Sequence, residues 1–360
     1  MSKIISIGTA VPAYCHQQAD ILQFMQTVYS TTETDKRKLR FIYQQSGIKQ
    51  RYSVIADYSK PIEDWKFYPQ TENLEPFPTL EQRMMIFNKQ GPSLSVDSIR
   101  DCLNHVHDPK KITHLITVSC TGMSAPGLDL QIVELMDLQN NIFRTSVNFM
   151  GCYAAIHGLK IADAICKADE HAKVLIVCTE LCTLHFQREA TVDNITSSLL
   201  FGDGSAAILM AGDANEQAGL HIDNFYSEII PKGKRDMAWE LSSHGFLMTL
   251  SGYVPDLIEE DFEKIVDRAL KKEKISKEKI SHWCIHPGGK RILEAIHKSL
   301  QFTNGQLSAS YKILNDYGNL SSASIVFVLK EQLYEKKAIK KLFGAAFGPG
   351  LSVETFTAHY

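Results

Sequence analysis

Short apolar runs alternate with longer helix-like segments along most of this chain, and this alternation is typical of an α/β protein. The runs are almost continuously apolar, so we expect strands that are covered on both faces. The candidate strands are residues 4–7, 115–119, 145–149, 173–179, 206–210, 282–286 and 341–345.

The chain has 360 residues, more than one hydrophobic core usually contains, and this predicts two lobes or one enlarged domain. Small and polar residues over 212–219 mark the expected boundary between two halves, residues 1–215 and 216–360. A duplication of two similar α/β halves is compatible with the number of candidate strands.

Local patterns predict several further elements. A capping box at residues 79–82 predicts a helix through Phe87. Residues 154–166 read as a helix that is apolar on most sides, hence central and buried. Residues 56–78 lack periodicity and predict a surface loop bordering an entrance, and the charge run at 270–280 predicts a solvated helix end.

Composition narrows the class of protein. The hydrophobic fraction of 44% is ordinary for a globular protein, and a net charge of −3 argues against a nucleic-acid coat or a polybasic membrane anchor. No segment reaches the roughly 18 apolar residues of a membrane span. The first residues lead directly into a candidate strand without the pattern of a signal peptide, so we expect a cytoplasmic enzyme.

Eight scattered cysteines form no CxxC pair, which argues against a structural zinc site and favours reduced thiols. Among them, Cys152 follows a β-prone run and Gly151, at the point where small helix-tolerant residues begin. A thiol at the start of a helix is favoured as a thiolate, so we expect a lowered pKa and a nucleophile. A buried structural cysteine is the alternative.

Two later segments carry polar groups that complement this cysteine. His286 ends an apolar run and precedes Pro-Gly-Gly, which predicts a histidine presented at a strand tip. Asn319 follows a glycine at the head of a predicted helix. A hydrogen-bonded turn histidine and an N-cap asparagine are the structural alternatives. Together with Cys152 they make up a nucleophile, an imidazole to activate it and an amide donor for a thioester oxyanion.

These segments resemble the type III polyketide synthases, the chalcone synthase superfamily. The resemblance runs from residue 5 to the C-terminal strand, and its most specific motifs are residues 151–152, 286–289, 318–323 and 347–354, with 178–180 and 201–207 also matching. It implies a homodimer with the thiolase fold, a five-layer αβαβα sandwich of two related halves.

The resemblance also implies a reaction. Cys152 would carry an acyl group taken from a CoA thioester, malonyl-CoA would be decarboxylated for each extension, and the poly-β-keto chain would then cyclise. His286 would pair with the thiolate, and His286 and Asn319 would stabilise the enolate. No resident cofactor or metal is implied, because CoA thioesters are substrates.

Positions around the implied cavity differ from the plant enzymes. Phe201 matches one gatekeeper phenylalanine, but the second aligns with Met248, a cavity glycine aligns with Trp239, and two cavity threonines align with Cys182 and His185. The other expected wall residues are Thr121, Phe347, Gly348 and Pro349. A larger indole and a softer gate disfavour a bulky coumaroyl starter and favour alkylpyrone, alkylresorcinol or phloroglucinol products.

For the CoA nucleotide, the resemblance points to Lys38 and to the segment with Gly288, Gly289 and Arg291. The family's next arginine after Lys38 falls on Phe41 in this chain. Two other functions stay open. One is a β-ketoacyl carrier-protein synthase III, which uses the same three side-chain types. The other is a catalytically silent CoA-binding scaffold.

Overall fold

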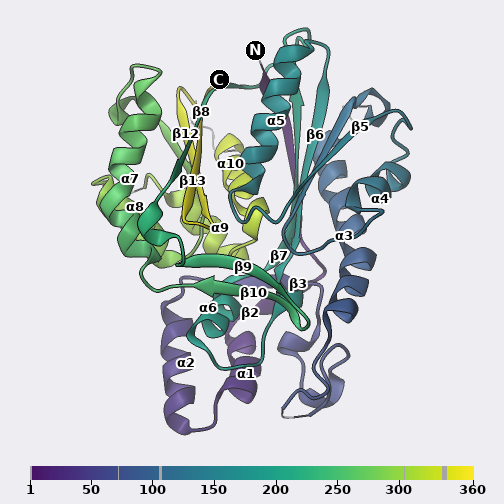
Figure 1. The fold of residues 1–360 in the computed structure, drawn as a ribbon, viewed down its shortest axis with the longest axis vertical. Helices are drawn as coiled ribbons and strands as arrows, with labels where there is room; N and C mark the ends of the chain where they lie inside the picture. The colour runs from purple at the N-terminus through teal and green to yellow at the C-terminus, as the bar shows by residue number, and fades with distance from the viewer. Residues whose placement is uncertain (1, 72, 105–107, 304, 335–338) are drawn as a thin grey trace.

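The computed structural model describes residues 2–71, 73–104, 108–303, 305–334 and 339–360. Figure 1 shows that two sheet regions alternate with three layers of helices, so the chain forms a five-layer α/β sandwich. A smaller region of helices and short strands lies below these layers.

The first sheet region combines a parallel edge with an antiparallel remainder. β4 pairs in parallel with both β5 and β6, whereas β6, β7 and β1 follow one another antiparallel. The strands in spatial order are β5 (Phe143–Asn148), β4 (His114–Ser119), β6 (Lys173–Leu181), β7 (Asp203–Ala211) and β1 (Lys3–Ala10).

The second region repeats this plan: β11 and β12 are parallel, and β12, β13 and β8 follow antiparallel. Lys3 pairs with His221 and Ile4 with Leu220, so the two regions are joined where β1 meets β8. Among the described residues they form one nine-stranded sheet. The strands are β11 (His282–Ile285), β12 (Leu342–Gly348), β13 (Ser352–His359) and β8 (Leu220–Ile229). The two halves are therefore related.

Helices cover both faces of both sheet regions. α5 and α10 lie between the sheets, α3 and α4 cover one outer face, and α7 and α8 cover the other (Figure 1). The bounds are α3 (Leu80–Leu103), α4 (Leu128–Leu135), α5 (Ala154–Ala168), α7 (Val254–Lys271), α8 (Lys290–Ser299), α9 (Ser308–Tyr317) and α10 (Ser324–Tyr334).

The lower region supplies much of the lining of the functional site. It contains two small antiparallel sheets, β2 with β3 and β9 with β10. Its elements are β2 (Tyr14–Gln17), α1 (Gln18–Tyr29), α2 (Glu33–Gln45), β3 (Gln50–Ser53), η4 (Cys182–His185), α6 (Val192–Leu200), β9 (Met237–Ser242) and β10 (Gly245–Leu250).

Every predicted strand is present, usually one to four residues longer than predicted. The capping box is confirmed, because the Thr79 hydroxyl accepts from the Gln82 amide and the Gln82 side chain accepts from the Thr79 amide. The helix continues to Leu103, well beyond Phe87. The predicted central helix is α5, which lies between the sheets.

The expectation of a surface loop over 56–78 was wrong in one respect. The segment has only short 3-10 turns, but Tyr58, Trp65 and Tyr68 are buried. They pack around Phe24 with ring centroids 4.9–5.5 Å apart. Aromatic residues without a helical or strand period therefore form a core here, because their rings gather around one side chain from α1.

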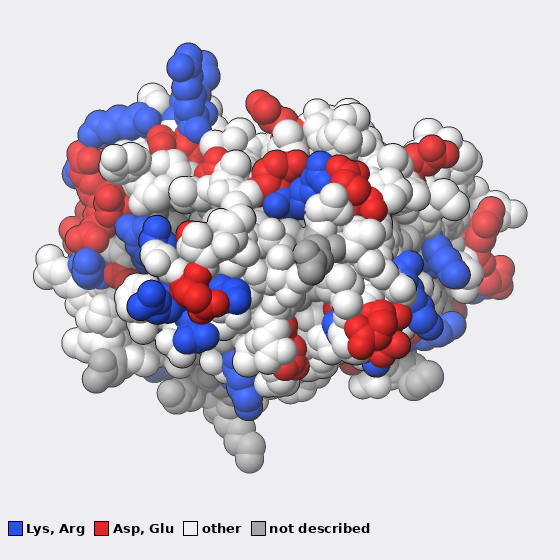
Figure 2. All heavy atoms as spheres, turned by 90° about the horizontal axis from the view of Figure 1, so that it is seen from below, with Lys and Arg blue, Asp and Glu red and all other residues white. Residues whose placement is uncertain are grey.

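The charge run over 270–280 and the cysteines can be compared with the sequence predictions. The charge run ends α7 and is largely exposed, and all eight cysteines are free. Lysine, arginine and acidic side chains are interspersed on the lower face (Figure 2). Within the described ranges, no helix combines the length and apolar composition that a bilayer crossing requires.

Candidate active site

Cys152 lies between β5 and α5, as predicted. The chain turns sharply before it, since Phe149 and Gly151 have positive φ angles of 60° and 90°. A β-carbon on Gly151 would lie 2.3 Å from the Cδ atom of Pro349, so a side chain does not fit at this turn. The turn leaves Cys152 only 9% exposed.

His286 directly follows β11, at the strand tip that the sequence predicted. Its backbone N–H donates to the Ala345 carbonyl at 2.9 Å, which continues the pairing with β12. The imidazole is 2% exposed, and neither ring nitrogen has a hydrogen-bond partner among the described residues. Buried polar atoms usually have partners, so two free ring nitrogens mark a group available for another role.

Asn319 connects the histidine segment with the cysteine. Its side-chain N–H donates to the Gly288 carbonyl at 3.3 Å, two residues after His286, and its Oδ1 accepts from the Ser321 amide at 2.9 Å. Hydrogen bonds from Ser321 and Asn319 lower the pKa of the Cys152 thiol. The structure thus brings the Asn319 amide to Cys152 and to the His286 segment.

The predicted direction of the Cys152 pKa was wrong. Burial raises the pKa of the thiol to about 12, and the charge of Glu180 raises it further, against the opposing effect of Ser321 and Asn319. Burial also lowers the pKa of His286 to about 3. Burial thus favours the neutral form of both groups, because each would lose the solvation of its charged form.

Glu180 is a site residue that the sequence reasoning had noted only as part of a motif. Its carboxylate accepts from the Cys120 amide (2.9 Å), the Thr121 hydroxyl (2.8 Å) and the Ser322 hydroxyl (2.5 Å). Burial raises its pKa to about 7, and these three donors oppose the rise. An acidic residue inside an otherwise apolar strand was the signal in the sequence.

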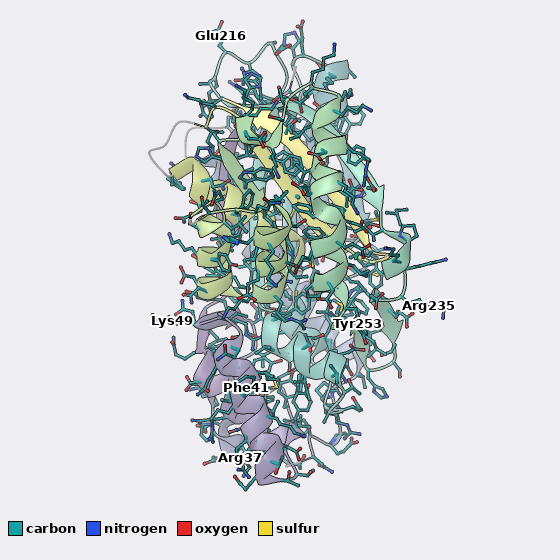
Figure 3. The ribbon with its side chains drawn as sticks, turned by 90° about the vertical axis from the view of Figure 1, so that its left-hand side faces the viewer. Arg37, Phe41, Lys49, Glu216, Arg235 and Tyr253 are labelled. Atoms are coloured by element: carbon teal, nitrogen blue, oxygen red, sulfur yellow. The ribbon has the colours of Figure 1, made fainter. Side chains whose placement is uncertain are left out.

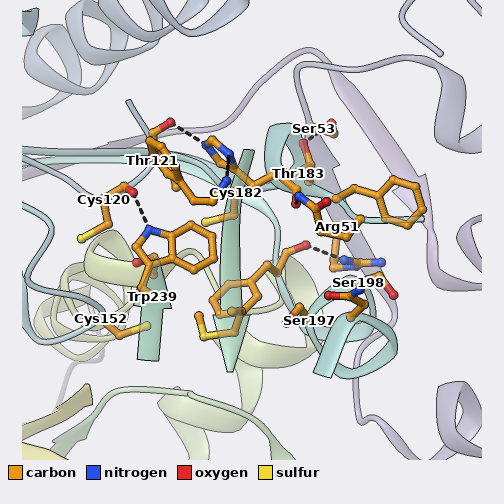
Figure 4. A pocket seen from close by; sticks show the side chains of 18 of the residues that line it. Arg51, Ser53, Cys120, Thr121, Cys152, Cys182, Thr183, Ser197, Ser198 and Trp239 are labelled. Carbon is orange, nitrogen blue, oxygen red and sulfur yellow. Dashed lines mark hydrogen bonds between the residues drawn. The ribbon is translucent and has the colours of Figure 1, made fainter. Parts of the chain in front are cut away.

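Cys152 opens onto a cavity that contains about 930 Å³ free of protein atoms, part of it open to solvent. Figure 4 shows Cys120, Cys152 and Trp239 on one side and Arg51, Ser197 and Ser198 on the other. The lining residues predicted from the sequence are Thr121, Cys152, Cys182, His185, Phe201, Trp239, Met248 and Pro349. Unpredicted lining residues include Ile21, Met25, Ser53, Tyr58, Cys120, Thr183, Phe186, Phe246 and Ser321.

An aromatic cluster forms one wall of this cavity. The His185 imidazole stacks on Phe246 with centroids 4.2 Å apart, and Trp239 meets both rings edge-on at 5.7 and 5.8 Å. The Trp239 indole N–H donates to the Cys120 carbonyl at 2.7 Å. The Phe246 amide donates to His185 Nδ1 and His185 Nε2–H donates to the Thr121 carbonyl, which fixes a neutral tautomer.

Two predicted wall residues do not line the cavity. Phe347 is buried against Phe262 at 5.4 Å, because alternate residues of β12 face opposite sides and this one faces the α7 layer. Gly348 lies against Tyr153, where a β-carbon would come within 2.3 Å of the ring. Only Pro349 of this segment reaches the cavity.

The residues predicted for CoA lie outside the cavity. Lys38 is exposed on α2, and Arg291 is exposed in the first turn of α8. Gly289 is the N-cap of α8, and the Gly288 carbonyl accepts from Asn319. None of these four residues lines the cavity onto which the Cys152 thiol opens.

Comparison with known proteins agrees with this geometry. The family model for the N-terminal domain of chalcone and stilbene synthases matches residues 1–214, and that for the C-terminal domain matches residues 221–360. A putative chalcone synthase of Bacillus subtilis is 31% identical over 98% of this chain and 97% of its own length. A probable polyketide synthase of Dictyostelium discoideum is 30% identical, and the chain spans 11% of that much longer protein.

Solved structures are similar over nearly the whole chain. PKS-I from the brown alga Ectocarpus siliculosus has a TM-score of 0.93 at 26% identity, covering 99% of this chain and 98% of that one. The C-terminal type III polyketide synthase domain of Steely1 from Dictyostelium has a TM-score of 0.91 at 29% identity, covering 99% of each chain. The fold is thus the thiolase-like sandwich of these enzymes. Because both family models match and a relative is 31% identical over nearly its whole length, the chain belongs to the type III polyketide synthases, the chalcone and stilbene synthase family of acyl-transferring condensing enzymes.

Proposed function

We propose that this enzyme loads an acyl-CoA starter onto Cys152, extends it iteratively with malonyl-CoA and cyclises the product to a pyrone, resorcinol or phloroglucinol. The observation that carries the proposal is the meeting of Cys152 and Asn319 beside a largely apolar cavity, with the free imidazole of His286 in the adjoining segment.

The loading step uses His286 as a base. The Cys152 sulfur attacks the thioester carbonyl while its proton passes to the neutral imidazole, and the proton then leaves with CoA as its thiol. The new C–S bond on Cys152 replaces the C–S bond to CoA. An amide N–H from Asn319 stabilises the oxyanion of this step.

Extension uses the same groups a second time. Malonyl-CoA loses CO₂, and the electron pair that remains forms an enolate whose oxygen accepts from Asn319 and from the N–H of His286. The enolate carbon then attacks the acyl carbonyl on Cys152, so that a C–C bond forms and the C–S bond breaks. Asn319 suits this role because it is a neutral donor and does not compete as a base.

The cavity wall supports a flexible aliphatic starter. The Trp239 indole fills space that a glycine at this position would leave open. Met248 pairs with Trp239 across the β9–β10 hairpin and contributes a flexible side chain to the cavity lining. Ile21, Met25 and Phe186 extend the apolar lining towards α1. A rigid aromatic starter is disfavoured by this shape.

CoA itself would stay near the surface. We assign its phosphates to Lys38 and to the N-terminus of α8 at Gly289 and Arg291, where unpaired N–H groups favour anions. Figure 3 locates α2, the helix that carries Lys38, by the labels of Arg37 and Phe41. Lys38→Ala should therefore raise the KM for acyl-CoA with little effect on kcat.

A homodimer is part of the proposal. β5 is the outermost strand of the first sheet region, and its neighbourhood exposes Met123, Leu135 and Phe143 at 50%, 55% and 68%. A bare strand edge with exposed apolar side chains favours a second copy of the chain. Light scattering of the purified protein tests this, and Phe143→Glu should yield monomers.

The defining experiment supplies malonyl-CoA with a panel of acyl-CoA starters and no carrier protein, followed by mass spectrometry. Pyrones or resorcinols from the wild type and none from Cys152→Ala would support the proposal. Turnover that requires a carrier protein would instead favour a β-ketoacyl carrier-protein synthase III. The absence of a resident cofactor and the cytoplasmic location stay predictions.

A further inference from the structure

Two residues join the halves of the chain directly beside the nucleophile. Phe201 and Asn319 form a parallel bridge outside the named strands, in which the Gly202 amide donates to the Asn319 carbonyl at 3.0 Å and the Asn319 amide donates to the Leu200 carbonyl at 2.8 Å. So short a pairing has little rigidity of its own. The position of the Asn319 amide therefore depends on what holds this bridge.

The bridge is attached to the C-terminal end of α6. Three successive carbonyls there accept hydrogen bonds from other elements. The pairs are Gln18 Nε2 to Leu199 O (3.0 Å), Asn319 N to Leu200 O (2.8 Å) and Arg51 Nη1 to Phe201 O. The last carbonyls of a helix lack partners within it and carry partial negative charge, so a guanidinium is well suited to this end.

Arg51 is buried without an ion pair. Arg51 is only 4% exposed. Among the described residues, no carboxylate oxygen lies within 4.0 Å of its guanidinium nitrogens. Its Nε atom donates a hydrogen bond to Gln18 Oε1 at 3.0 Å. A buried cation is costly unless nearby dipoles compensate it, and the end of α6 supplies such dipoles. Figure 4 shows Arg51 beside Ser198 of this helix.

The aliphatic stem of Arg51 packs against the backbone on both sides of the bridge. A β-carbon on Gly318 would lie 2.8 Å from the Arg51 Cδ atom, and one on Gly202 would lie 3.5 Å from its Cβ atom. Gly318 also has a φ angle of 71°, which favours glycine. The stem thus occupies the space next to Gly318, the residue that directly precedes Asn319.

We propose that Arg51 is a positioning residue for the Asn319 amide. Its guanidinium caps α6 at Phe201 and its stem supports Gly318, so that the bridge holds Asn319 at hydrogen-bonding position to Cys152. Arg51 touches no reacting atom and acts through this bridge. The inference rests on the proposed role of Asn319, but its test needs only the thiol.

The test is a double-mutant cycle on the alkylation of Cys152 by iodoacetamide, followed as a function of pH by peptide mass spectrometry. Asn319 lowers the pKa of Cys152, so Asn319→Ala should slow labelling at a fixed pH about threefold or more. Arg51→Ala should slow it by a similar factor, and the double variant should be no slower than either single variant. Arg51→Lys, which keeps the charge and most of the stem, should recover part of the rate.

Arg83 provides a matched control. It is also fully buried, and it donates to the carbonyls of Pro78 and Phe186, each at 3.1 Å. Arg83→Ala should lose thermal stability as Arg51→Ala does, yet its effect on labelling should be independent of Asn319→Ala. A wild-type labelling profile in Arg51→Ala, or additive effects of the Arg51 and Asn319 changes, would overturn the proposal.

Malonyl-CoA decarboxylation gives a second readout. Arg51→Ala should reduce it about 100-fold, as expected for a displaced oxyanion donor, with Arg51→Lys intermediate. If the wild type does not decarboxylate malonyl-CoA, the proposed function fails while the labelling cycle still decides the role of Arg51. If Arg51→Ala does not melt cooperatively, Arg51→Lys combined with Asn319→Ala completes the cycle.

Discussion

Trp239 should limit the length of the acyl chain that the enzyme accepts. Its indole stands edge-on to His185 and Phe246 and lines the cavity together with Cys152. Trp239→Ala would free on the order of 150 Å³, comparable with known engineered cavities, beside the cavity onto which Cys152 opens. At roughly 30 Å³ for each non-hydrogen atom, this is room for about five more atoms.

The energetic effect can be estimated from burial. Three additional methylene groups at about 0.8 kcal/mol each are worth about 2.4 kcal/mol, so kcat/KM for the longer starter should rise roughly 50-fold relative to the shorter one. The variant should also lose about 3 kcal/mol of stability, since the half-buried indole leaves a cavity and a lost hydrogen bond to Cys120. The assay is competition between acyl-CoA thioesters of different length, with products resolved by mass spectrometry.

Trp239→Phe separates volume from hydrogen bonding. It keeps most of the ring but cannot donate to the Cys120 carbonyl, so it should retain the chain-length preference of the wild type. A folded Trp239→Ala enzyme with an unchanged preference would refute the argument that the indole sets this dimension of the cavity.

Three further predictions concern ionisation. Alkylation of Cys152 should be slow near neutral pH and rise as the pH exceeds 9, because burial raises the thiol pKa to about 12; a rate that is flat from pH 6 to 10 would contradict this. Glu180→Gln should accelerate this labelling at a given pH, because the Glu180 charge raises the Cys152 pKa, and an unchanged rate would exclude that coupling. Burial raises the pKa of Glu180 to about 7 and of Asp203 to about 6, so the folded state binds more protons than the unfolded state between about pH 4 and 7. Stability should therefore fall as the pH rises through this window, by about 3 kcal/mol for each group, and thermal melts of Glu180→Gln should show a smaller fall than those of the wild type.

Much of the fold was predictable because its strands are covered on both faces. β4, β6, β7 and β12 read as continuous apolar runs, and a strand between two helical layers must be apolar on both sides. β8 was missed, because its residues alternate between buried and partly exposed positions and include His221 and Asp223. The β9–β10 hairpin was also missed, since its short strands have mostly partly buried positions.

The positions of the site residues at turns and strand ends were predictable, whereas the burial and direction of their side chains were less so. Cys152 and His286 were placed correctly at the end of a turn and of a strand, because glycine and proline mark such points in any sequence. The predictions that were wrong concern how far a group is excluded from solvent and which way a side chain faces. The thiol pKa depends on solvent exclusion by segments distant in the chain, and Phe347 turned away because of the pleat of β12.

The sequence by itself determined which residues end strands beside glycine turns, since this depends on local chemistry, and which residue types are available for acyl transfer. Only the tertiary structure decided that Cys152 and His286 are buried, that Glu180 lies close enough to Cys152 to raise its pKa, and that Arg51 packs beside the segment that carries Asn319. These properties arise from burial and from contacts between segments that are distant in the sequence, which no local pattern encodes.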